Sequence, residues 1–263
     1  MVRLFSVILA IFCLWSCSTS PTGKTQLHLL SESQMAEMGN AAYTEIKQQT
    51  STVKSGRLNQ YVRCVATAIT QEVAPRSDWD INLFQDQSAN AFALPGGHIG
   101  VNTGLLKVAQ NQHQLAAVIG HEIAHVEAEH ANARISTAYA TQAGLALVQV
   151  LAGTESTEKQ QLLALLGVGA QVGVLLPYGR SQESEADILG LEYMARAGFD
   201  PRQSIDLWQN MARASHEQPL EFLSTHPSHN TRMEQLNAHM SKALSLYEQA
   251  RTQGRGARCD SKG

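Results

Sequence analysis

Two histidines and an acid stand close together in the sequence, in the order His121, Glu122, two apolar residues and His125. In an α-helix a separation of four residues is a rotation of about 400°, so both imidazoles point to the same side, one turn apart. Two nitrogen atoms can then bind one metal ion, while the neighbouring Glu122 reaches a metal-activated water without binding the metal. The spacing predicts a catalytic metal site with His121 and His125 as ligands and Glu122 as the general base.

A third ligand must come from elsewhere, because catalytic zinc takes three protein ligands and leaves one position for water. Glu183 and Asp187 are four residues apart in a later helical pattern and share one helix face. We expect Glu183 to bind the metal and Asp187 to accept a hydrogen bond from a ligand histidine. Glu185 is about 160° from Asp187 around the helix and is expected to face solvent. Taken alone, such acids are more often a solvated face, but the upstream motif favours the metal site.

The rest of the pattern indicates the elements that must position these residues. Apolar residues recur every three or four positions between residues 31 and 74, where Ser31 and Ser33 are suitable helix caps. Residues 79–84 and 91–101 contain β-formers, and Pro95-Gly96-Gly97 marks a turn. Helical periodicity returns at residues 112–134 and continues to about residue 250. We therefore expect an α+β fold, mostly helical with a small sheet. The apolar residues 162–176 are too few for a membrane span, which favours a buried core helix.

The composition excludes two broad classes of protein. The chain has 263 residues, of which 43% are hydrophobic, with 20 basic and 23 acidic side chains and a formal net charge of −3. This is enough apolar material for a folded core in one or two domains, so the chain is not disordered. The charge lacks the basic excess of nucleic-acid-binding proteins, and no nucleic-acid partner is expected.

The first sixteen residues have the pattern of an export signal, with Arg3 before an apolar run that is too short to span a bilayer. Leu14-Trp15-Ser16-Cys17 resembles the lipobox of bacterial lipoproteins, in which the cysteine is acylated and becomes the first residue. Ser18, where an inner-membrane signal would have Asp, implies sorting to the outer membrane, facing the periplasm. Residues 17–30 would then be the lipidated cysteine and a flexible tether. An ordinary cleaved signal is the alternative.

Export also changes the expectation for the cysteines, because the compartment outside the inner membrane is oxidising. Cys13 would leave with the signal and Cys17 would carry lipid, so Cys64 and Cys259 remain as an even pair. We expect these two residues to form a disulfide. Two unrelated reduced thiols are the alternative.

Four segments, taken in order, resemble the M48 family of zinc metallopeptidases. They are Asn90-Ala91-Phe92-Ala93-Leu94-Pro95-Gly96-Gly97, His121-Glu122-x-x-His125, Glu183-x-x-Ala186-Asp187, and His226-Pro227 followed by Arg232. The resemblance extends over roughly residues 90–236, and the helical stretch from Ser31 onward is also similar in style. Within the family, the chain most resembles the soluble lipoprotein branch of bacterial envelopes. It implies a gluzincin-like domain over residues 31–252, followed by a tail at residues 253–263.

The resemblance further implies one zinc ion held by His121, His125 and Glu183, and endoproteolysis of proteins, often misfolded ones. It assigns residues 90–97 to an edge strand that borders the active-site cleft and pairs with an extended substrate. The substrate-binding residues would be Asn90, Ala91, Phe92, Ala93, Pro95, Gly96 and Gly97. Backbone pairing at a strand edge binds a peptide without demanding its sequence. A plain hairpin turn is the alternative for this stretch.

The same resemblance places His226 and Arg232 near the metal. His226 can donate a hydrogen bond to the oxyanion formed at the attacked carbonyl, or it can occupy the fourth metal position and hold the enzyme latent. A connecting histidine with no chemical role is the third interpretation. We expect Arg232 to anchor this loop through a carboxylate. His130 is about 140° off the ligand face of a continuous helix, which predicts a structural or surface role.

Together these observations predict a zinc-dependent endopeptidase of the bacterial cell envelope that acts on protein or peptide substrates and is anchored to outer-membrane lipid through acylated Cys17. One alternative is a chaperone-like assembly or quality-control factor with little proteolysis, which the intact Glu122 disfavours. Another is a structural zinc protein, which is disfavoured because two histidines and one glutamate leave an open coordination position.

Overall fold

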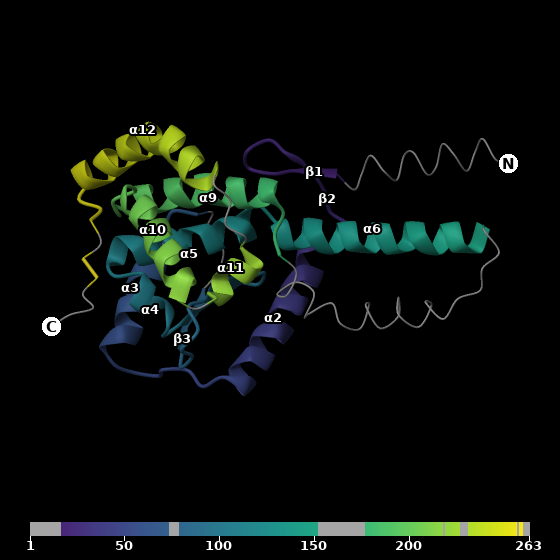
Figure 1. Ribbon diagram of the computed structural model, residues 1–263, viewed down its shortest axis with the longest axis horizontal. Coiled ribbons are helices and arrows are strands. Elements are labelled where there is room, and N and C mark those ends of the chain that lie inside the picture. The colour runs from purple at the N-terminus through teal and green to yellow at the C-terminus, as the bar shows by residue number, and fades with distance from the viewer. Residues whose placement is uncertain are drawn as a thin grey trace.

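The computed structural model describes residues 17–73, 79–151, 177–217, 219–226, 231–256 and 258–259. Helices dominate the molecule and a small sheet lies to one side, as Figure 1 shows, so the predicted α+β class is confirmed. The elements are β1 (Cys17–Thr19), β2 (Thr25–Leu27), α2 (Glu32–Gln49), α3 (Arg57–Thr70), β3 (Asp80–Phe84), β4 (Ala91–Leu94), β5 (His98–Asn102), α4 (Leu105–Val108), α5 (Gln112–Glu127), α6 (His130–Leu151), α9 (Arg180–Arg196), α10 (Gln203–Glu217), α11 (Glu221–Thr225) and α12 (Thr231–Thr252).

Strand β4 is at one edge of a three-stranded sheet with the order β3-β5-β4. β3 runs parallel to β5, whereas β4 is antiparallel to it and places Ala93 opposite Ile99. The turn between β4 and β5 contains Gly96 and Gly97, whose φ angles of 92° and 85° lie in the left-handed region that side chains disfavour. The Pro-Gly-Gly signal in the sequence is therefore a hairpin turn, and it directs β4 along the edge of the sheet.

Helices α5 and α9 form the centre of the molecule. They pack directly against each other, with α3 and strand β4 also against α5, and with α12 covering α9. Ile119, Ile123 and Ala124 on α5 are fully buried, as are Ala186 and Met194 on α9. Because both helices are enclosed by apolar side chains, the residues between them are held in fixed positions.

The prediction of one helix over residues 112–134 is wrong in one respect. α5 ends at Glu127, Glu129 adopts a positive φ of 51°, and α6 begins at His130. A non-glycine residue in the left-handed region reverses the local direction of the chain. The rotation per residue in α5 cannot be extended across this turn. The angle of about 140° that was predicted between His130 and the ligand face therefore does not apply.

The N-terminal segment is folded, so the predicted flexible tether over residues 17–30 is wrong for these residues. β1 and β2 pair as an antiparallel hairpin, and Ser20 in its turn is buried. The side chain of Gln26 donates to the backbone oxygen of Ala128, and the backbone N–H of Leu29 donates to Ser136. The hairpin is thus fixed to α6 and to the turn before it. Ser31 then caps α2 through a reciprocal pair of hydrogen bonds with Gln34.

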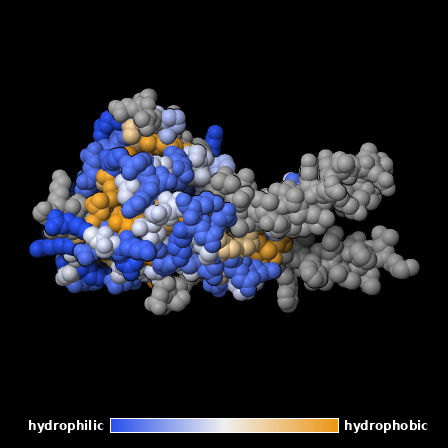
Figure 2. Space-filling model, turned by 90° about the horizontal axis from the view of Figure 1, so that it is seen from below, coloured by the Kyte–Doolittle hydropathy of each residue, from blue (hydrophilic) through white to orange (hydrophobic). Residues whose placement is uncertain are grey.

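A disulfide joins Cys64 on α3 to Cys259 near the C-terminus. The signal segment at residues 1–16, the apolar segment at residues 162–176 and Pro227 lie outside the described residues. Among the helices that are described, none has both the length and the apolar character needed to cross a bilayer. The face of the molecule shown in Figure 2 is mostly hydrophilic, with smaller hydrophobic areas between the polar ones.

Candidate metal centre

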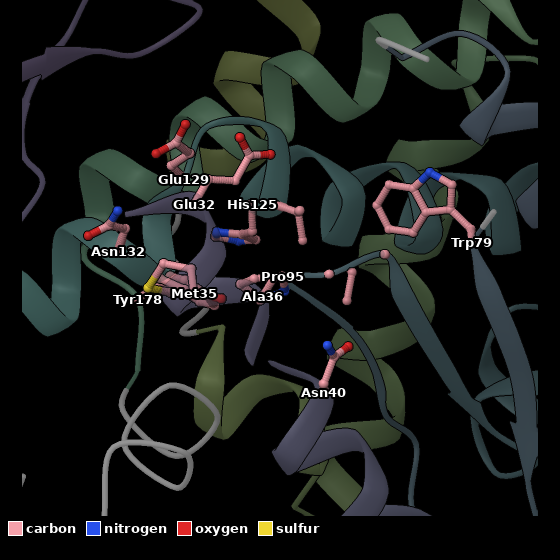
Figure 3. A pocket seen from close by; sticks show the side chains of 15 residues that line it. Glu32, Met35, Ala36, Asn40, Trp79, Pro95, His125, Glu129, Asn132 and Tyr178 are labelled. Atoms are coloured by element: carbon pink, nitrogen blue, oxygen red, sulfur yellow. The ribbon is translucent and has the colours of Figure 1, made fainter. Parts of the chain in front are cut away.

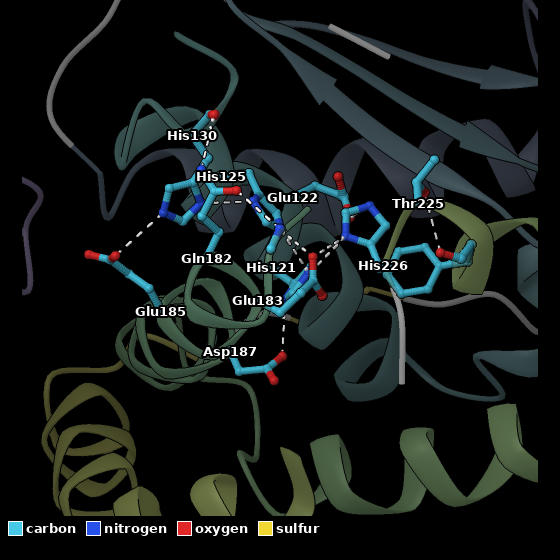
Figure 4. Close-up of polar contacts among 12 residues, drawn as sticks. His121, Glu122, His125, His130, Gln182, Glu183, Glu185, Asp187, Thr225 and His226 are labelled. Carbon is cyan, nitrogen blue, oxygen red and sulfur yellow. Dashed lines mark hydrogen bonds and ion pairs between the residues drawn. The ribbon is translucent and has the colours of Figure 1, made fainter. Parts of the chain in front are cut away.

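Four side chains from three parts of the chain converge on one point. His121 and His125 come from α5, Glu183 from the first turn of α9, and His226 from the end of α11. One donor atom from each lies within 4.8 Å of all the others, and all four residues are buried. Figure 4 shows these side chains pointing toward one another. The structure therefore brings together the three predicted ligands and adds His226 as a fourth donor.

The separations between donor atoms fit a zinc ion. Nε2 of His121 is 3.1 Å from Nε2 of His125 and 3.5 Å from a carboxylate oxygen of Glu183, and Nε2 of His125 is 3.4 Å from that carboxylate. Tetrahedral zinc with bonds of about 2.0–2.1 Å separates its ligand atoms by about 3.3–3.4 Å. A nitrogen and carboxylate donor set of this kind suits Zn²⁺, and zinc is the cofactor that this cluster implies.

Asp187 and Arg232 lie behind the metal ligands. Oδ1 of Asp187 is 3.0 Å from Nδ1 of His121, on the side of the ring away from the cluster. Arg232 donates to both carboxylate oxygens of Asp187 at 2.6 Å, and its Nη1 is 2.8 Å from Oε2 of Glu183. The guanidinium of Arg232 lies over the ring of Trp208 at 3.8 Å. One buried arginine thus holds two carboxylates, one of which orients His121.

These charges shift the pKa values of the cluster. Burial disfavours a charged His121, but Asp187 and Glu183 outweigh burial and raise the pKa of His121 to about 9. Burial has the opposite effect on Glu183, yet hydrogen bonds from His121, His125 and His226 hold the pKa of its carboxyl far below the usual range. Burial also lowers the pKa of His125 well below its ordinary value. An ionised Glu183 and a neutral His125 are the forms that bind a metal.

Glu122 is next to the cluster without joining it. It is buried, and burial raises the pKa of its carboxyl, while a hydrogen bond from the backbone of Ala93 acts against this. Its Oε1 is 3.4 Å from Nε2 of His226 and accepts no hydrogen bond within the described part of the chain. Because Ala93 belongs to the edge strand β4, the carboxylate lies between the strand and the cluster.

His226 is held in the cluster by two aromatic rings. Its Nδ1 is 3.2 Å from Nε2 of His121 and 3.1 Å from Oε1 of Glu183. Phe222 stacks on one side with ring centroids 4.5 Å apart, and Tyr178 stacks at 5.1 Å. In this structure His226 is therefore an additional possible donor beside the three predicted ligands.

The model of peptidase family M48 matches residues 53–240, which is more than half of the chain. This chain belongs to peptidase family M48. The resemblance predicted from the four sequence segments is thus confirmed.

Relatives within the M48 family are named as proteases. The chain is 33% identical over 263 residues to "Metalloendopeptidase OMA1, mitochondrial" of Bos taurus, covering 93% of this chain and 50% of that protein. It is 35% identical over 167 residues to the mitochondrial metalloendopeptidase OMA1 of Schizosaccharomyces pombe, with 63% and 48% covered. It is 27% identical over 213 residues to the beta-barrel assembly-enhancing protease of Escherichia coli, with 78% and 43% covered. The chain spans about half the length of the curated relatives it matches.

A cavity of about 320 Å³ opens beside the metal ligands of this M48 domain. Its walls come from α2, from the turn after β4, from His125 and from Tyr178. Figure 3 shows His125 and Pro95 between Trp79 and Tyr178, with Glu32 and Glu129 nearby. The cavity joins the predicted substrate strand to the metal cluster and is large enough for an amino-acid side chain.

Two polar residues occupy places that sequence reasoning did not predict. His130 is fully buried and its Nδ1 is 2.8 Å from Nδ1 of His125, because the turn at Glu129 brings it back over the ligand face. A surface role for His130 is therefore excluded. Glu185 is 1% exposed, so the expectation that it faces solvent is wrong. The N-terminal hairpin, residues 17–27, and α6 cover this side of α9. The position of a residue around its own helix does not show which distant segments will cover it.

Two aromatic residues at the site were missed. Tyr178 stacks on His125 with ring centroids 3.7 Å apart, and Trp208 supports Arg232. In the sequence Tyr178 is only part of a Pro-Tyr-Gly helix break, and Trp208 has no distinguishing neighbours. Their contacts connect segments that are far apart in the chain, so local patterns carry no signal for them.

Proposed function

We propose that this M48 domain is a zinc-dependent endopeptidase that hydrolyses peptide bonds of unfolded or misfolded proteins. The observation that carries the proposal is the position of the buried Glu122, which lies between the metal cluster and the edge strand β4. A zinc site that only stabilises the fold does not require a carboxylate that lies beside the ligands without binding the metal. The names of the relatives as metalloendopeptidases and as a protease support the same activity.

His121, His125 and Glu183 would hold the zinc ion. When bound, zinc polarises the carbonyl of the scissile peptide and makes water a better nucleophile. Glu122 accepts one proton from the attacking water as the new oxygen–carbon bond forms. It then delivers that proton to the leaving amine as the carbon–nitrogen bond breaks. Asp187 and Arg232 keep His121 and Glu183 in place during these steps.

The edge strand β4 supports the choice of an extended peptide as substrate. Within the described residues β4 pairs on one side only, with β5, so its other edge can accept a strand. Ala93 at the middle of β4 lines the cavity beside His125, together with Pro95, Gly96 and Gly97 of the following turn. We propose Asn90, Ala91, Phe92, Ala93, Pro95, Gly96 and Gly97 as the substrate-binding segment, with the cavity taking one substrate side chain.

We further propose that His226 holds the enzyme latent. Its Nδ1 is near both His121 and Glu183, so in this arrangement it occupies the direction that water and substrate need. The backbone N–H of Phe222 in α11 donates to the oxygen of Ala89, and Asn90 donates to Glu221. α11 therefore also rests at the start of the proposed substrate strand.

The cell envelope is the proposed location. The support is the signal-like residues 1–16 and the lipobox-like cysteine at position 17, with an outer-membrane anchor facing the periplasm. One relative is named for beta-barrel assembly, whereas others are named as mitochondrial. The test is mass spectrometry of the processed N-terminus, and a mature chain that does not begin at an acylated Cys17 would contradict the anchor.

Casein digestion by the purified protein tests the activity. We expect cleavage that stops with a chelator and returns with Zn²⁺. Glu122→Gln should keep the bound zinc but lose activity by about 10²–10⁴-fold, because the proton acceptor is removed. Glu183→Ala should lose most of the zinc. Retained proteolysis in Glu122→Gln, or equal zinc content in Glu183→Ala and the wild type, would contradict the assignment. Binding of casein without cleavage would favour a chaperone-like factor.

A further inference from the structure

A buried polar pair, His130 and Glu185, connects a metal ligand to the N-terminal hairpin. On the side of His125 away from the metal cluster, Nδ1 is 2.8 Å from Nδ1 of His130. Nε2 of His130 is 3.4 Å from Oε2 of Glu185, as Figure 4 shows. Both side chains are almost completely enclosed. Neither residue takes part in the proposed hydrolysis, so their burial needs a separate explanation.

The hydrogen bonds of this pair all run in one direction when His125 binds a metal. Because Nε2 of His125 faces Glu183, its ring proton must be on Nδ1, which then donates to Nδ1 of His130. The accepting His130 carries its own proton on Nε2 and donates it to the carboxylate of Glu185. The arrangement therefore fixes both the tautomer and the ring orientation of His125, as outer partners of metal ligands do.

The N-terminal hairpin, here defined as residues 17–27, holds the other oxygen of Glu185. Ser20 donates its hydroxyl to Oε1 of Glu185 at 2.5 Å, and Thr22 donates its hydroxyl at 2.6 Å and its backbone N–H at 3.3 Å. Nζ of Lys24 is 3.6 Å from Oε2 and also donates to the backbone oxygen of Ser181. Three hydrogen bonds and one charge from a five-residue stretch are directed at one buried carboxylate.

We propose that the N-terminal hairpin is a positioning element of the metal centre, acting on His125 through Glu185 and His130. This inference rests on the proposed metal site. His130 and Glu185 are positioning residues, and Ser20 and Thr22 supply the contact from the hairpin. Because the hairpin begins at Cys17, the proposed lipid anchor would be coupled to the metal ligand through the side chains of His130, Glu185, Ser20 and Thr22.

The alternative is that these residues only attach the hairpin to the domain. Attachment alone does not require buried ionisable groups, because apolar side chains of similar size stabilise a buried contact at least as well. The hairpin also has an attachment that avoids the pair, since Gln26 donates to the backbone oxygen of Ala128. This second contact provides a matched control.

The test compares zinc affinity in two variants that break the pathway and two that leave it intact. Glu185→Gln keeps the shape but has one acceptor oxygen where the carboxylate has two, so it cannot accept from His130 and from the hairpin hydroxyls together. The double variant Ser20→Ala/Thr22→Val removes both hairpin hydroxyls that donate to Glu185 and leaves the backbone N–H of Thr22 and the charge of Lys24. Gln26→Ala removes a hairpin contact elsewhere, and Glu192→Gln removes a carboxylate of α9 that pairs with Lys242. Zn²⁺ affinity is measured by competition with a chromophoric chelator, and the visible absorption spectrum of Co²⁺ in the same site reports ligand geometry.

We expect both pathway variants to bind Zn²⁺ about 10–100-fold more weakly than the wild type and to alter the Co²⁺ spectrum. Both controls should match the wild type, with thermal unfolding temperatures measured for all five proteins. Unchanged affinity and spectrum in either pathway variant would overturn the inference, as would equal loss in Gln26→Ala. A wild-type protein that binds no Zn²⁺ would instead contradict the proposed function. If Glu185→Gln does not fold, the Ser20/Thr22 variant alone decides the outcome.

Discussion

At the scale of single residues, the metal centre consists of buried carboxylates and imidazoles whose charges must offset one another. Arg232 contributes most of the fixed positive charge, because it contacts Asp187 and Glu183 together. Arg232, which we expected to anchor the His226 loop through a carboxylate, does pair with carboxylates, and these are Asp187 and Glu183. Both of its carboxylate partners are on α9, so Arg232 fixes the metal ligands. Arg232 and His226 therefore have separate roles, and their variants should differ in sign.

His226→Ala should raise the basal rate of casein cleavage several-fold. Nδ1 of the imidazole is 3.2 Å from Nε2 of His121 and 3.1 Å from Oε1 of Glu183, so in the proposed latent arrangement it excludes water and substrate, and its removal opens this place. The measurement is initial cleavage rate at equal zinc loading, checked by metal analysis.

Arg232→Ala is the companion variant and should lower both zinc content and activity, because Glu183 and Asp187 lose their common partner. A fall in kcat for His226→Ala would instead favour the oxyanion role of that histidine. An unchanged rate would leave it without a chemical role.

At the scale of elements, the site depends on how closely α5 and α9 approach. Gly120 on α5 faces Gly190 on α9, one residue before the ligand His121. A Cβ atom at Gly190 would lie 2.7 Å from the backbone nitrogen of His121 and 2.8 Å from the carbonyl carbon of Gly120. These neighbours are backbone atoms, so no side-chain rotation can relieve the contact. The two glycines thus allow α9 to bring Glu183 and Asp187 to His121.

Gly190→Ala should lower the free energy of unfolding by about 1–3 kcal/mol, the usual effect of overpacking, and should also weaken zinc binding. The physical reason is that the helices must separate, which moves the α9 carboxylates away from His121. Urea unfolding and chelator competition measure the two effects. Gly256→Ala is the control, since within the described part of the chain no atom beyond its immediate chain neighbours lies within 4 Å of the added methyl group. Unchanged zinc affinity in Gly190→Ala would show that the helix contact does not set the ligand geometry.

At the scale of the whole molecule, the disulfide between Cys64 and Cys259 closes most of the chain into a loop, with a sequence separation of 195. The backbone N–H of Cys259 donates to Gln112 at the start of α5, and Arg255 pairs with Glu72 after α3. The C-terminal segment is therefore held against α3 and α5, on the side of α5 where the helix begins.

The double variant Cys64→Ala/Cys259→Ala should lower the free energy of unfolding by up to about 5 kcal/mol, because its unfolded chain is no longer constrained by the long loop. Zinc affinity should change little, since the disulfide does not contact the metal ligands. Urea unfolding of the oxidised wild type, the reduced wild type and the variant gives the difference. Reduction that leaves the unfolding midpoint unchanged, or free thiols at both positions in protein from the periplasm, would contradict a stabilising disulfide.

The sequence alone determined the parts of the site that lie within one helix. His121, Glu122 and His125 are related by helical rotation, as are Glu183 and Asp187, and the β4–β5 turn follows from Pro95-Gly96-Gly97. The pairing of the two helices came from the family resemblance and from the need for a third ligand, since helical phase relates residues of the same helix only.

Only the tertiary structure decided the places of His130, Glu185, Tyr178 and Trp208. The left-handed turn at Glu129 interrupts the phase that made His130 a surface residue, and the N-terminal hairpin covers the side of α9 where Glu185 was expected to meet solvent. A sequence pattern reports which face of a helix a residue occupies. What covers that face depends on segments distant in the chain, and for Glu185 the covering residues, Ser20 and Thr22, are more than 160 positions away.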